Sequence, residues 1–284
     1  MSHFNLDSAD RIEVLRGPFS ALYGNASGGV VQIFTADGRD PPELRVGVTG
    51  GSFGALRTSL NARGKQDDFD YTIDYSYFRS DGYREHSAAQ RHSLNVKLAL
   101  SLSNGATLTL IGNDLEQPDT QDPLGITRAQ FDANPRQTAA VAAQYNTRKR
   151  VAQAQGGAIY EQAIGDSNSV RALLYGGSRD IVQFLSIPAA TQGAPTQAGG
   201  VVDLATGYGG TDLRWTHRAQ WAGQPLELSA GIYSDTTPVA GLLFRATSAL
   251  TCTRRLAARS RHRPSPRPAT APTAVPGWRS TCAR

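Results

Sequence analysis

The chain has few of the residue groupings on which catalytic and metal sites are built. Its five histidines are His3, His86, His92, His217 and His262. They are scattered, and no two have the i, i+4 spacing of a zinc-binding helix. Asp67, Asp68 and Asp70 lie at an expected hairpin, where carboxylates are ordinary turn residues. The sequence therefore predicts that the protein is not an enzyme and holds neither a metal nor a cofactor.

Long apolar runs are also absent. The longest apolar stretches fall well short of the ~18 residues that a membrane-spanning helix needs, which argues against such a helix. Residues 1–10, MSHFNLDSAD, have neither a basic start nor an apolar segment. We therefore expect no secretory signal peptide in this chain.

Acidic residues are missing from the end of the chain. The net charge is +5, but all 24 acidic residues lie at or before Asp235, whereas nine of the 29 basic ones follow it. Residues 1–235 therefore carry a net charge of −4, and the basic character belongs to the end. A nucleic-acid-binding domain needs Lys and Arg clustered on a folded face. The charge distribution thus predicts no nucleic acid among the partners.

The last segment, residues 251–284, differs from the rest of the chain. It holds five of the 15 prolines and both cysteines, Cys252 and Cys282, and it shows no strand alternation. Such a composition cannot bury enough apolar surface to offset the entropy of ordering it, so we expect disorder. Its richness in Arg, Pro, Ala and Thr is typical of a GC-rich gene translated out of frame. We favour this frameshift interpretation over an evolved basic arm.

Alternation with a period of two residues dominates the middle of the chain. Residues 70–77 read DYTIDYSY, residues 94–102 place Leu or Val at every even position, and residues 226–232 repeat the pattern. Segments of about ten residues with one apolar and one polar face suit transmembrane β-barrel strands. The same alternation fits a soluble β-sandwich whose apolar faces form a core. About ten strands are expected between Leu44 and Ile232, and the alternation alone leaves both architectures open.

The connections between these expected strands differ in length. Asp81-Gly82 and Asn104-Gly105 are turn signals, and the second predicts a tight hairpin. Residues 114–150 and 186–207 show no sustained alternation, so we expect long loops there. Short turns at one end and long loops at the other are typical of outer-membrane barrels.

The most informative segment is residues 11–35, RIEVLRGPFSALYGNASGGVVQIFT. A strand must stop at its proline, which lacks a backbone N–H, and its glycines supply positive-φ positions. We therefore expect a compact turn between two short strands. The turn residues are Gly17, Pro18, Tyr23, Gly24, Gly28 and Gly29. A phosphate-binding loop is excluded, because the Lys-Ser/Thr pair is missing and a strand pattern follows where a helix is required.

Three blocks of this segment carry a family resemblance. Arg-Ile-Glu-Val-Leu-Arg-Gly-Pro, Leu-Tyr-Gly and Gly-Gly-Val-Val-x-Ile-x-Thr, at this spacing, resemble the last part of the plug domain of TonB-dependent outer-membrane receptors. The resemblance implies an all-β fold: a partial transmembrane antiparallel β-barrel with a C-terminal remnant of the plug domain and a disordered C-terminal tail. It implies three regions: the plug remnant (1–38), the first barrel strands with long extracellular loops (39–250), and the tail (251–284).

The resemblance also leads us to expect a fragment. Outer-membrane transporters of this kind have 22 strands around a plugged lumen, and about ten strands are expected in this chain. The energy-coupling segment that TonB contacts precedes the matching part of the plug in the family. We therefore expect an internal fragment of a receptor gene that does not transport on its own.

Two site roles follow from the resemblance. The arginine of the Arg-Gly-Pro block is Arg16, which would latch the plug to carboxylates of the barrel wall, with Glu13 as a partner inside the plug. A planar guanidinium suits such a latch, because its fork matches a carboxylate. The alternative is a charge at a strand edge that faces lumen water.

The ligand and the location are likewise implied by the resemblance. The parent protein would be a monomer among the lipids of the cell outer membrane and would import a ferric siderophore or another anionic small molecule with the TonB complex. Residues 122–136 resemble a loop of ferric-citrate-type receptors. The candidate ligand-binding residues are Arg128, Arg136, Arg148 and Arg150, because loop cations attract anions. In the alternative, neighbouring aspartates balance these charges in a solvated loop.

Two other functions stay open at this point. A passive outer-membrane porin would need no plug, so residues 11–35 argue against it. A soluble β-sandwich binding module would bury its apolar strand faces instead of exposing them to lipid.

Overall fold

The structure is a computed structural model of the 284-residue chain. It describes residues 6–17, 28–192, 199–221, 224–235, 239–247, 250–257 and 281–283.

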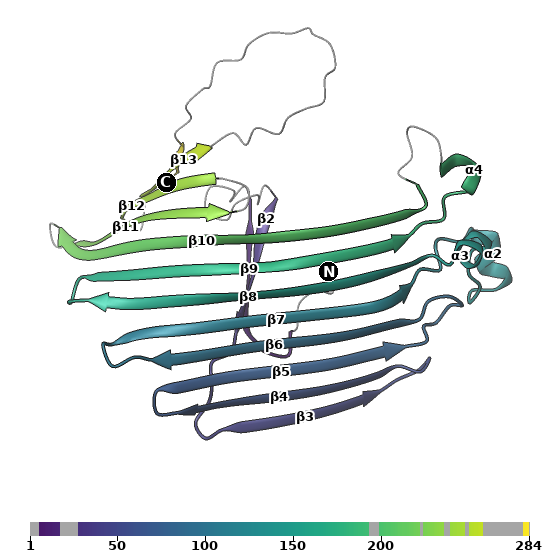
Figure 1. Cartoon of the computed structure of the whole chain (residues 1–284), viewed down its shortest axis with the longest axis horizontal. Helices are drawn as coiled ribbons and strands as arrows, with labels where there is room; N and C mark the ends of the chain where they lie inside the picture. Colours follow the sequence, from purple (N-terminus) through teal and green to yellow (C-terminus); the bar gives the residue numbers. More distant parts are fainter. Residues whose placement is uncertain are drawn as a thin grey trace, which may run out of the picture.

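One large antiparallel sheet, here called the wall, makes up most of the protein (Figure 1). Its described strands follow one another in chain order, each antiparallel to the next. They are β3 (Glu43–Gly50), β4 (Leu56–Gln66), β5 (Phe69–Ser80), β6 (Ala89–Ser101), β7 (Ala106–Gln121), β8 (Arg148–Ile164), β9 (Asn168–Phe184), β10 (Val201–Trp221), β11 (Gln224–Asp235), β12 (Val239–Thr247), β13 (Leu250–Ala257) and β14 (Thr281–Ala283). The two edge strands, β3 and β14, do not pair with each other among the described residues, so the wall is an open sheet. This confirms the predicted all-β, partial-barrel fold.

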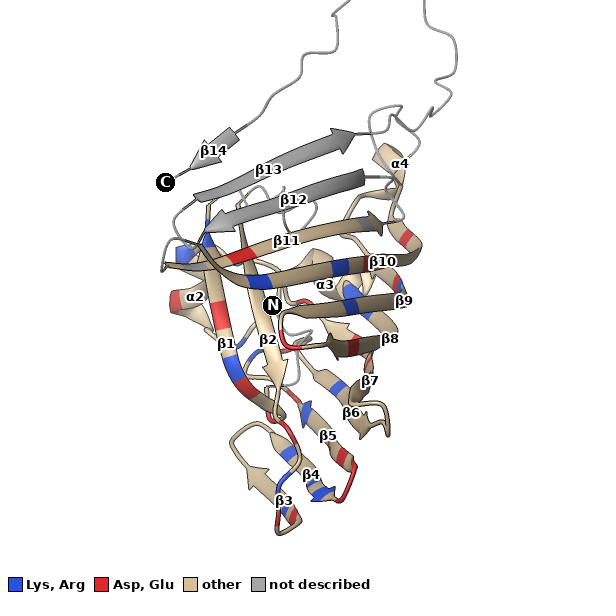
Figure 2. Cartoon of the chain, turned by 90° about the vertical axis from the view of Figure 1, so that its left-hand side faces the viewer, with Lys and Arg blue, Asp and Glu red and all other residues tan. Residues whose placement is uncertain are grey.

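A second, small sheet lies beside the wall. It consists of β1 (Ala9–Arg16) and β2 (Gly29–Thr35), paired antiparallel and here called the strand pair. The wall curves, and the strand pair stands on its concave side (Figure 2). The expected two short strands around the glycine-rich turn are therefore present.

The buried face of the wall is polar and the exposed face is apolar, which is the reverse of the arrangement in a soluble domain. On β5, Thr72 and Asp74 are completely buried on the concave face, whereas Ile73 and Tyr75 on the convex face are 38% and 39% exposed. The neighbouring β6 repeats the arrangement, with Asn95 buried and its apolar neighbours turned outward. Polar side chains thus lie beneath the strand pair, as the alternation predicts for a barrel.

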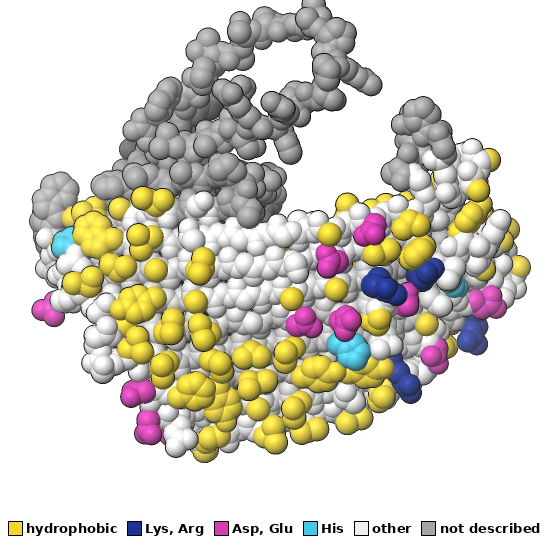
Figure 3. Space-filling view, in the orientation of Figure 1, with side chains coloured by type: hydrophobic (Ala, Val, Ile, Leu, Met, Phe, Trp, Pro, Cys, Tyr) yellow, Lys and Arg dark blue, Asp and Glu magenta, His cyan; other side chains and the backbone are white. Residues whose placement is uncertain are grey.

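Apolar and charged side chains also separate along the convex face. In Figure 3 most apolar side chains cover the half of this face toward the left, and most charged side chains and His gather in the half toward the right. The exposed apolar residues include Leu44, Val46, Leu60, Ile73, Leu94, Leu110, Leu174 and Leu213. An apolar surface of this extent is not expected to face water.

The short turns and the long loops lie at opposite ends of the wall. Residues 67–68, 102–105 and 165–167 form the turns at one end, and residues 51–55, 81–88, 122–147 and 185–200 connect strands at the other. The helices α2 (Arg128–Ala133), α3 (Ala140–Tyr145) and α4 (Ala189–Gln192) all belong to the long-loop end (Figure 1). The expected division into two ends is therefore present.

The loops are shorter than the sequence indicates. The expected loop 114–150 is partly strand, because β7 continues to Gln121 and β8 begins at Arg148. The expected loop 186–207 likewise gives way to β10 at Val201. Both errors have one cause: backbone pairing extends these strands past the apolar band, where side chains no longer alternate.

Strand β14, and all of β13 except its first residue, fall inside the region 251–284, for which the composition predicts disorder. β13 pairs with β12, and β14 pairs with β13 through residues 251–253 and 281–283. Backbone ladders do not require an alternating side-chain pattern, which is why composition does not indicate them. Residues 258–280 and 284 lie outside the described residues.

The buried polar face leads to a first prediction. The Thr72 hydroxyl donates a hydrogen bond to the carbonyl oxygen of Ala36, at 2.9 Å. The substitution Thr72→Val removes a buried donor and should lower the free energy of unfolding by about 1–2 kcal/mol. Urea titration of the detergent-solubilised chain measures this change.

Thr58→Val is the matched control, because Thr58 lies on the convex face of β4, opposite Val48 in the register. Its effect should be within ~0.5 kcal/mol. Equal losses at the two positions would contradict the assignment of the faces.

Candidate functional site

The expected plug turn is only partly within the described residues. Gly17 and Gly29 have positive φ values of 117° and 140°. A Cβ on Gly29 would lie 2.6 Å from the carbonyl oxygen of Leu15 on the neighbouring strand, so glycine is required there. Gly28 directly precedes β2. Pro18, Tyr23 and Gly24 lie outside the described residues.

Arg16 and Glu13 are not brought together. Arg16 stands at the last rung of the strand pair, opposite Gly29, and Glu13 stands opposite Gln32. Glu13 forms an exposed ion pair with Arg11, at 2.8 Å. Within the part of the chain that the structure describes, no carboxylate pairs with Arg16. The latch therefore stays a prediction.

Contacts with the wall are made far from Arg16, by residues 7–8, which precede β1, and by residues 35–38, which end and follow β2. We call these contacts, made with β4, β5 and β6, the seam. Lys97 of β6 donates to the carbonyl oxygen of Thr35, at 3.1 Å, and pairs with the carboxylate of Asp37. The backbone N–H of Gly38 donates to Asp70, at 2.7 Å. Sequence analysis identified the polar faces of β5 and β6 but not the segment that covers them.

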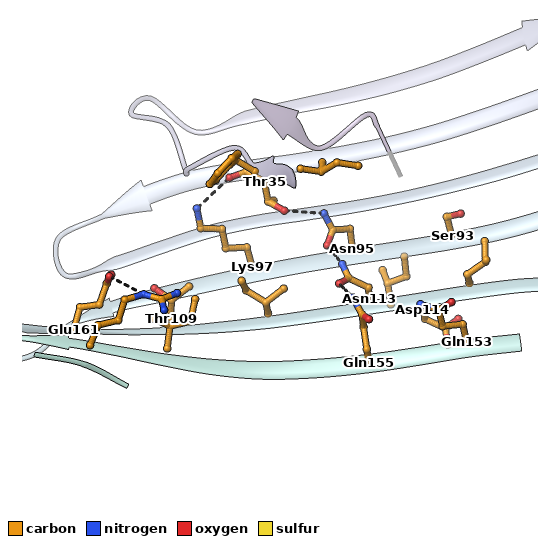
Figure 4. A pocket seen from close by; sticks show the side chains of 17 residues that line it. Thr35, Ser93, Asn95, Lys97, Thr109, Asn113, Asp114, Gln153, Gln155 and Glu161 are labelled. Atoms are coloured by element: carbon orange, nitrogen blue, oxygen red, sulfur yellow. Dashed lines mark hydrogen bonds and ion pairs between the residues drawn. The ribbon is translucent and has the colours of Figure 1, made fainter. Parts of the chain in front are cut away.

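A row of hydrogen bonds continues from the seam across the concave face. Asn95 donates to Ser8 and to the Thr35 hydroxyl, and it accepts from Asn113 on β7. Gln155 of β8 donates to Asn113, at 2.9 Å, and Tyr208 of β10 donates to Gln155, at 2.7 Å. Figure 4 shows the amides of Asn95, Asn113 and Gln155 in line. Neutral side chains thus connect the strand pair to four wall strands.

A cavity of about 450 Å³ lies between β2 and the wall strands β6 to β9. Hydroxyl and amide side chains supply most of its polar lining (Figure 4); they are Thr35, Ser93, Asn95, Thr109, Asn113, Gln153 and Gln155. Its cations are paired: Lys97 with Asp37, and Arg171 with Glu161 at 3.3 Å. The cavity therefore offers hydrogen bonds and little uncompensated charge.

The four arginines predicted to bind ligand do not line this cavity, and each has a partner within the chain. Arg128 pairs with Asp132, at 3.0 Å. Arg148 and Arg150 share Asp119, at 3.2 and 3.8 Å. The structure therefore favours the balanced-charge alternative at these three positions.

Arg136 joins two other loops. Its guanidinium lies over the ring of Phe53, 5.7 Å from the centroid, and donates to the carbonyl oxygen of Tyr83, at 3.3 Å. The rings of Phe53 and Tyr83 meet edge to face at 5.3 Å. Arg136 thus connects loops 51–55, 81–88 and 122–147.

Arg84, a residue that sequence analysis did not identify, holds loop 122–147 through three side-chain hydrogen bonds. Its guanidinium donates to the carbonyl oxygens of Leu124 at 2.6 Å, Gln137 at 2.9 Å and Pro123 at 3.3 Å. Next to it, the imidazole of His86 bonds the carbonyl oxygen of Thr147, at 2.8 Å. No motif marks Arg84, because its partners are main-chain groups 39 to 53 residues away.

Catalytic or metal chemistry finds no support in the described residues. Residues 50–54 read Gly-Gly-Ser-Phe-Gly, a match to the nucleophile-elbow pattern that sequence analysis overlooked. Ser52 lies in a turn between two antiparallel strands, however, and not between a strand and a helix. Among these residues no group of three or more His, Cys, Asp or Glu could hold a metal ion. No helix in the described part of the chain is long and apolar enough to cross a membrane.

Solved structures share this architecture. The unliganded ferric citrate transporter FecA is 16% identical, with a TM-score of 0.65 over 91% of this chain and 42% of that one. The ferric-catecholate import receptor Fiu from E. coli K12 is 14% identical, with a TM-score of 0.59 over 98% and 55%. The P. aeruginosa protein FpvA, in complex with a pyoverdine and iron, is 14% identical, with a TM-score of 0.61 over 91% and 34%.

These likenesses show a shared fold. The chain spans less than half the length of FecA and about a third of the length of FpvA. No family model matches the sequence. At 14–16% identity these structures show the fold of this chain and not its activity.

The Arg84 contacts lead to a second prediction. A lysine ammonium cannot replace a guanidinium that reaches three carbonyl oxygens in different directions. Arg84→Lys should therefore loosen loop 122–147, and limited proteolysis with trypsin should cleave this loop several-fold faster. Arg128→Lys is the control, because Arg128 is exposed and its partners among the described residues, Asp132 and the ring of Phe131, belong to its own helix. Equal cleavage rates in the wild type and Arg84→Lys would contradict the fastening role.

Proposed function

We propose that this chain belongs to a TonB-dependent outer-membrane receptor that imports a ferric siderophore. Residues 1–38 would be the end of the plug domain, residues 39–250 the first part of the barrel wall, and residues 251–284 a tail. The observation that carries the proposal is the plug-like strand pair on the polar, concave side of a curved wall whose convex face carries an apolar band. The import receptors with the same fold support it.

The convex face supports a position in a membrane. Its register aligns apolar residues on neighbouring strands: Tyr71, Leu98 and Leu110 form one rung. Toward the long loops, polar residues take over, with His92 opposite Glu116. An apolar band that ends in a polar zone is what a barrel wall presents to a bilayer. β8, β9 and β10 have 17, 17 and 21 residues, more than the ~9–11 needed to cross, so they would project beyond the lipid.

The ligand and the partners follow from the same proposal. FecA is described as a ferric citrate transporter, and residues 122–136 resemble a loop of such receptors. We infer that the parent protein takes an anionic ferric chelate of the citrate type, works with the TonB complex and is a monomer in the cell outer membrane. Because Arg128, Arg148 and Arg150 are already paired, an anionic ligand would have to compete with Asp119 and Asp132.

The two alternatives are less well supported. A porin would not need a strand pair fastened inside its wall. A soluble β-sandwich would bury the residues that are here exposed on the convex face, such as Val46 and Leu213.

A third prediction tests the membrane position. Leu110→Arg places a charge on the convex apolar band, and it should cost about 2–4 kcal/mol of stability in lipid if the band lies at the midplane. Thr109→Arg is the matched control, because Thr109 is the next residue and lines the concave cavity. Folding into lipid vesicles, followed by electrophoretic mobility, measures both. Equal tolerance of the two substitutions would contradict the membrane position.

A fourth prediction concerns transport. The chain, exported with a signal peptide into a strain that lacks its ferric citrate receptor, should not restore growth on ferric citrate. Transport needs a closed barrel, and open sheet edges leave N–H and C=O groups unpaired at several kcal/mol each in hydrocarbon. A complete receptor gene serves as the positive control. Growth supported by this chain alone would contradict the proposal that it is only part of a receptor.

A further inference from the structure

In the part of the chain that the structure describes, the strand pair is attached to the wall at the end that leads into β3. Within the described part of the chain, its side-chain hydrogen bonds and ion pairs to the wall come from residues 7–8 and from residues 35–38, which continue β2. The described residues 10–16 and 29–34 make none to the wall. The polar contact is therefore concentrated where the strand pair enters β3 through residues 36–42.

The fastened end is also the buried one. Ser8 is 2% and Ala36 8% exposed, and Asn95, which faces Ser8, is 5% exposed. Toward the other end of the pair, Ile12 and Val14 are 48% and 61% exposed. Hydrogen bonds shielded from water are stronger than those at the surface. Burial thus adds to the difference between the two ends.

Two wall residues supply most of the seam donors. Lys97 gives the Thr35 carbonyl a charge-assisted hydrogen bond while its ammonium is held beside Asp37. Asn95 donates to Ser8, which directly precedes β1, and to Thr35 at the end of β2, so that one amide joins both chain segments to β6. Its carbonyl oxygen is in turn held by Asn113.

We propose that Asn95 and Lys97 are positioning residues that keep residues 7–8 and 35–38 on the wall as a fixed anchor. The meaning of the anchor rests on the proposed receptor function: a pull on the chain before Ser8 would act on the seam before it reached the strand pair. The anchor is separate from the latch expected at Arg16, which stands at the opposite end of the strand pair.

Hydrogen–deuterium exchange tests the anchor in the full-length chain in detergent. The double variant Asn95→Ala/Lys97→Met should raise amide exchange in residues 29–37 by about tenfold, because each buried hydrogen bond contributes on the order of one factor of ten or less to the closing equilibrium. Exchange in β8 and β9 should stay unchanged and shows that the wall is folded. Lys97→Arg should keep the wild-type exchange rate, because an arginine can still donate to Thr35 and Asp37.

Gln153→Ala is the matched control, since Gln153 lines the same cavity on β8 and has no hydrogen bond to the strand pair among the described residues. Unchanged exchange in the double variant, or an equal rise in Gln153→Ala, would overturn the proposal. A cross-link gives a second measurement: in a Cys252→Ser/Cys282→Ser background, Ser8→Cys/Asn95→Cys should form a disulfide, whereas Val14→Cys/Asn95→Cys should not. Efficient cross-linking of the second pair would likewise overturn it.

The exchange result is independent of transport. If Leu110→Arg and Thr109→Arg are equally tolerated but the anchor variants still raise exchange, the receptor assignment fails and the anchor stands. If the membrane prediction holds and exchange does not respond, the anchor alone fails.

Discussion

The burial of polar side chains on the concave side of the wall is the constraint on which the remaining structure depends. Thr72 and Asp74 are fully buried although neither is apolar, and a buried polar group must be hydrogen-bonded. Thr72 meets this requirement through the main chain of residue 36, and Asp74 accepts from Asn61 at 2.9 Å. The segment that follows β2 is therefore a structural part of the wall as well as the connection into it.

The same constraint determines the environment that the convex face requires. Because the residues of a strand alternate between faces, placing polar residues beneath the strand pair turns Ile73, Tyr75 and Leu94 outward. These side chains pack against no second layer within the described residues, so the favourable environment for them is an apolar medium outside the protein. The membrane position that we propose thus follows from the side chains on the other face.

The four arginines predicted to bind a common ligand have different partners in the structure. Arg128, Arg136, Arg148 and Arg150 are close in sequence and were expected to act on a common ligand. In the structure two of them share Asp119, one pairs along its own helix, and Arg136 joins aromatic residues of two other loops. Arg84, which no pattern indicated, makes more contacts to loop 122–147 than the predicted residues do, because its partners are carbonyl groups that every sequence contains.

The sequence by itself determined the strand class, the faces and the strand pair. Alternation in residues 70–77 and 94–102 assigns each side chain to a face, since a strand has a fixed period of two, and the glycines at 17 and 29 meet positive-φ requirements that are local. The sequence did not indicate the strand ends near Gln121 and Val201, because backbone pairing extends strands without regard to the side-chain pattern. Only the tertiary structure decided which segment covers the polar face. Lys97 and Thr35 lie 62 residues apart, and their contact depends on how the intervening strands β3, β4 and β5 pair and curve, which no short motif encodes.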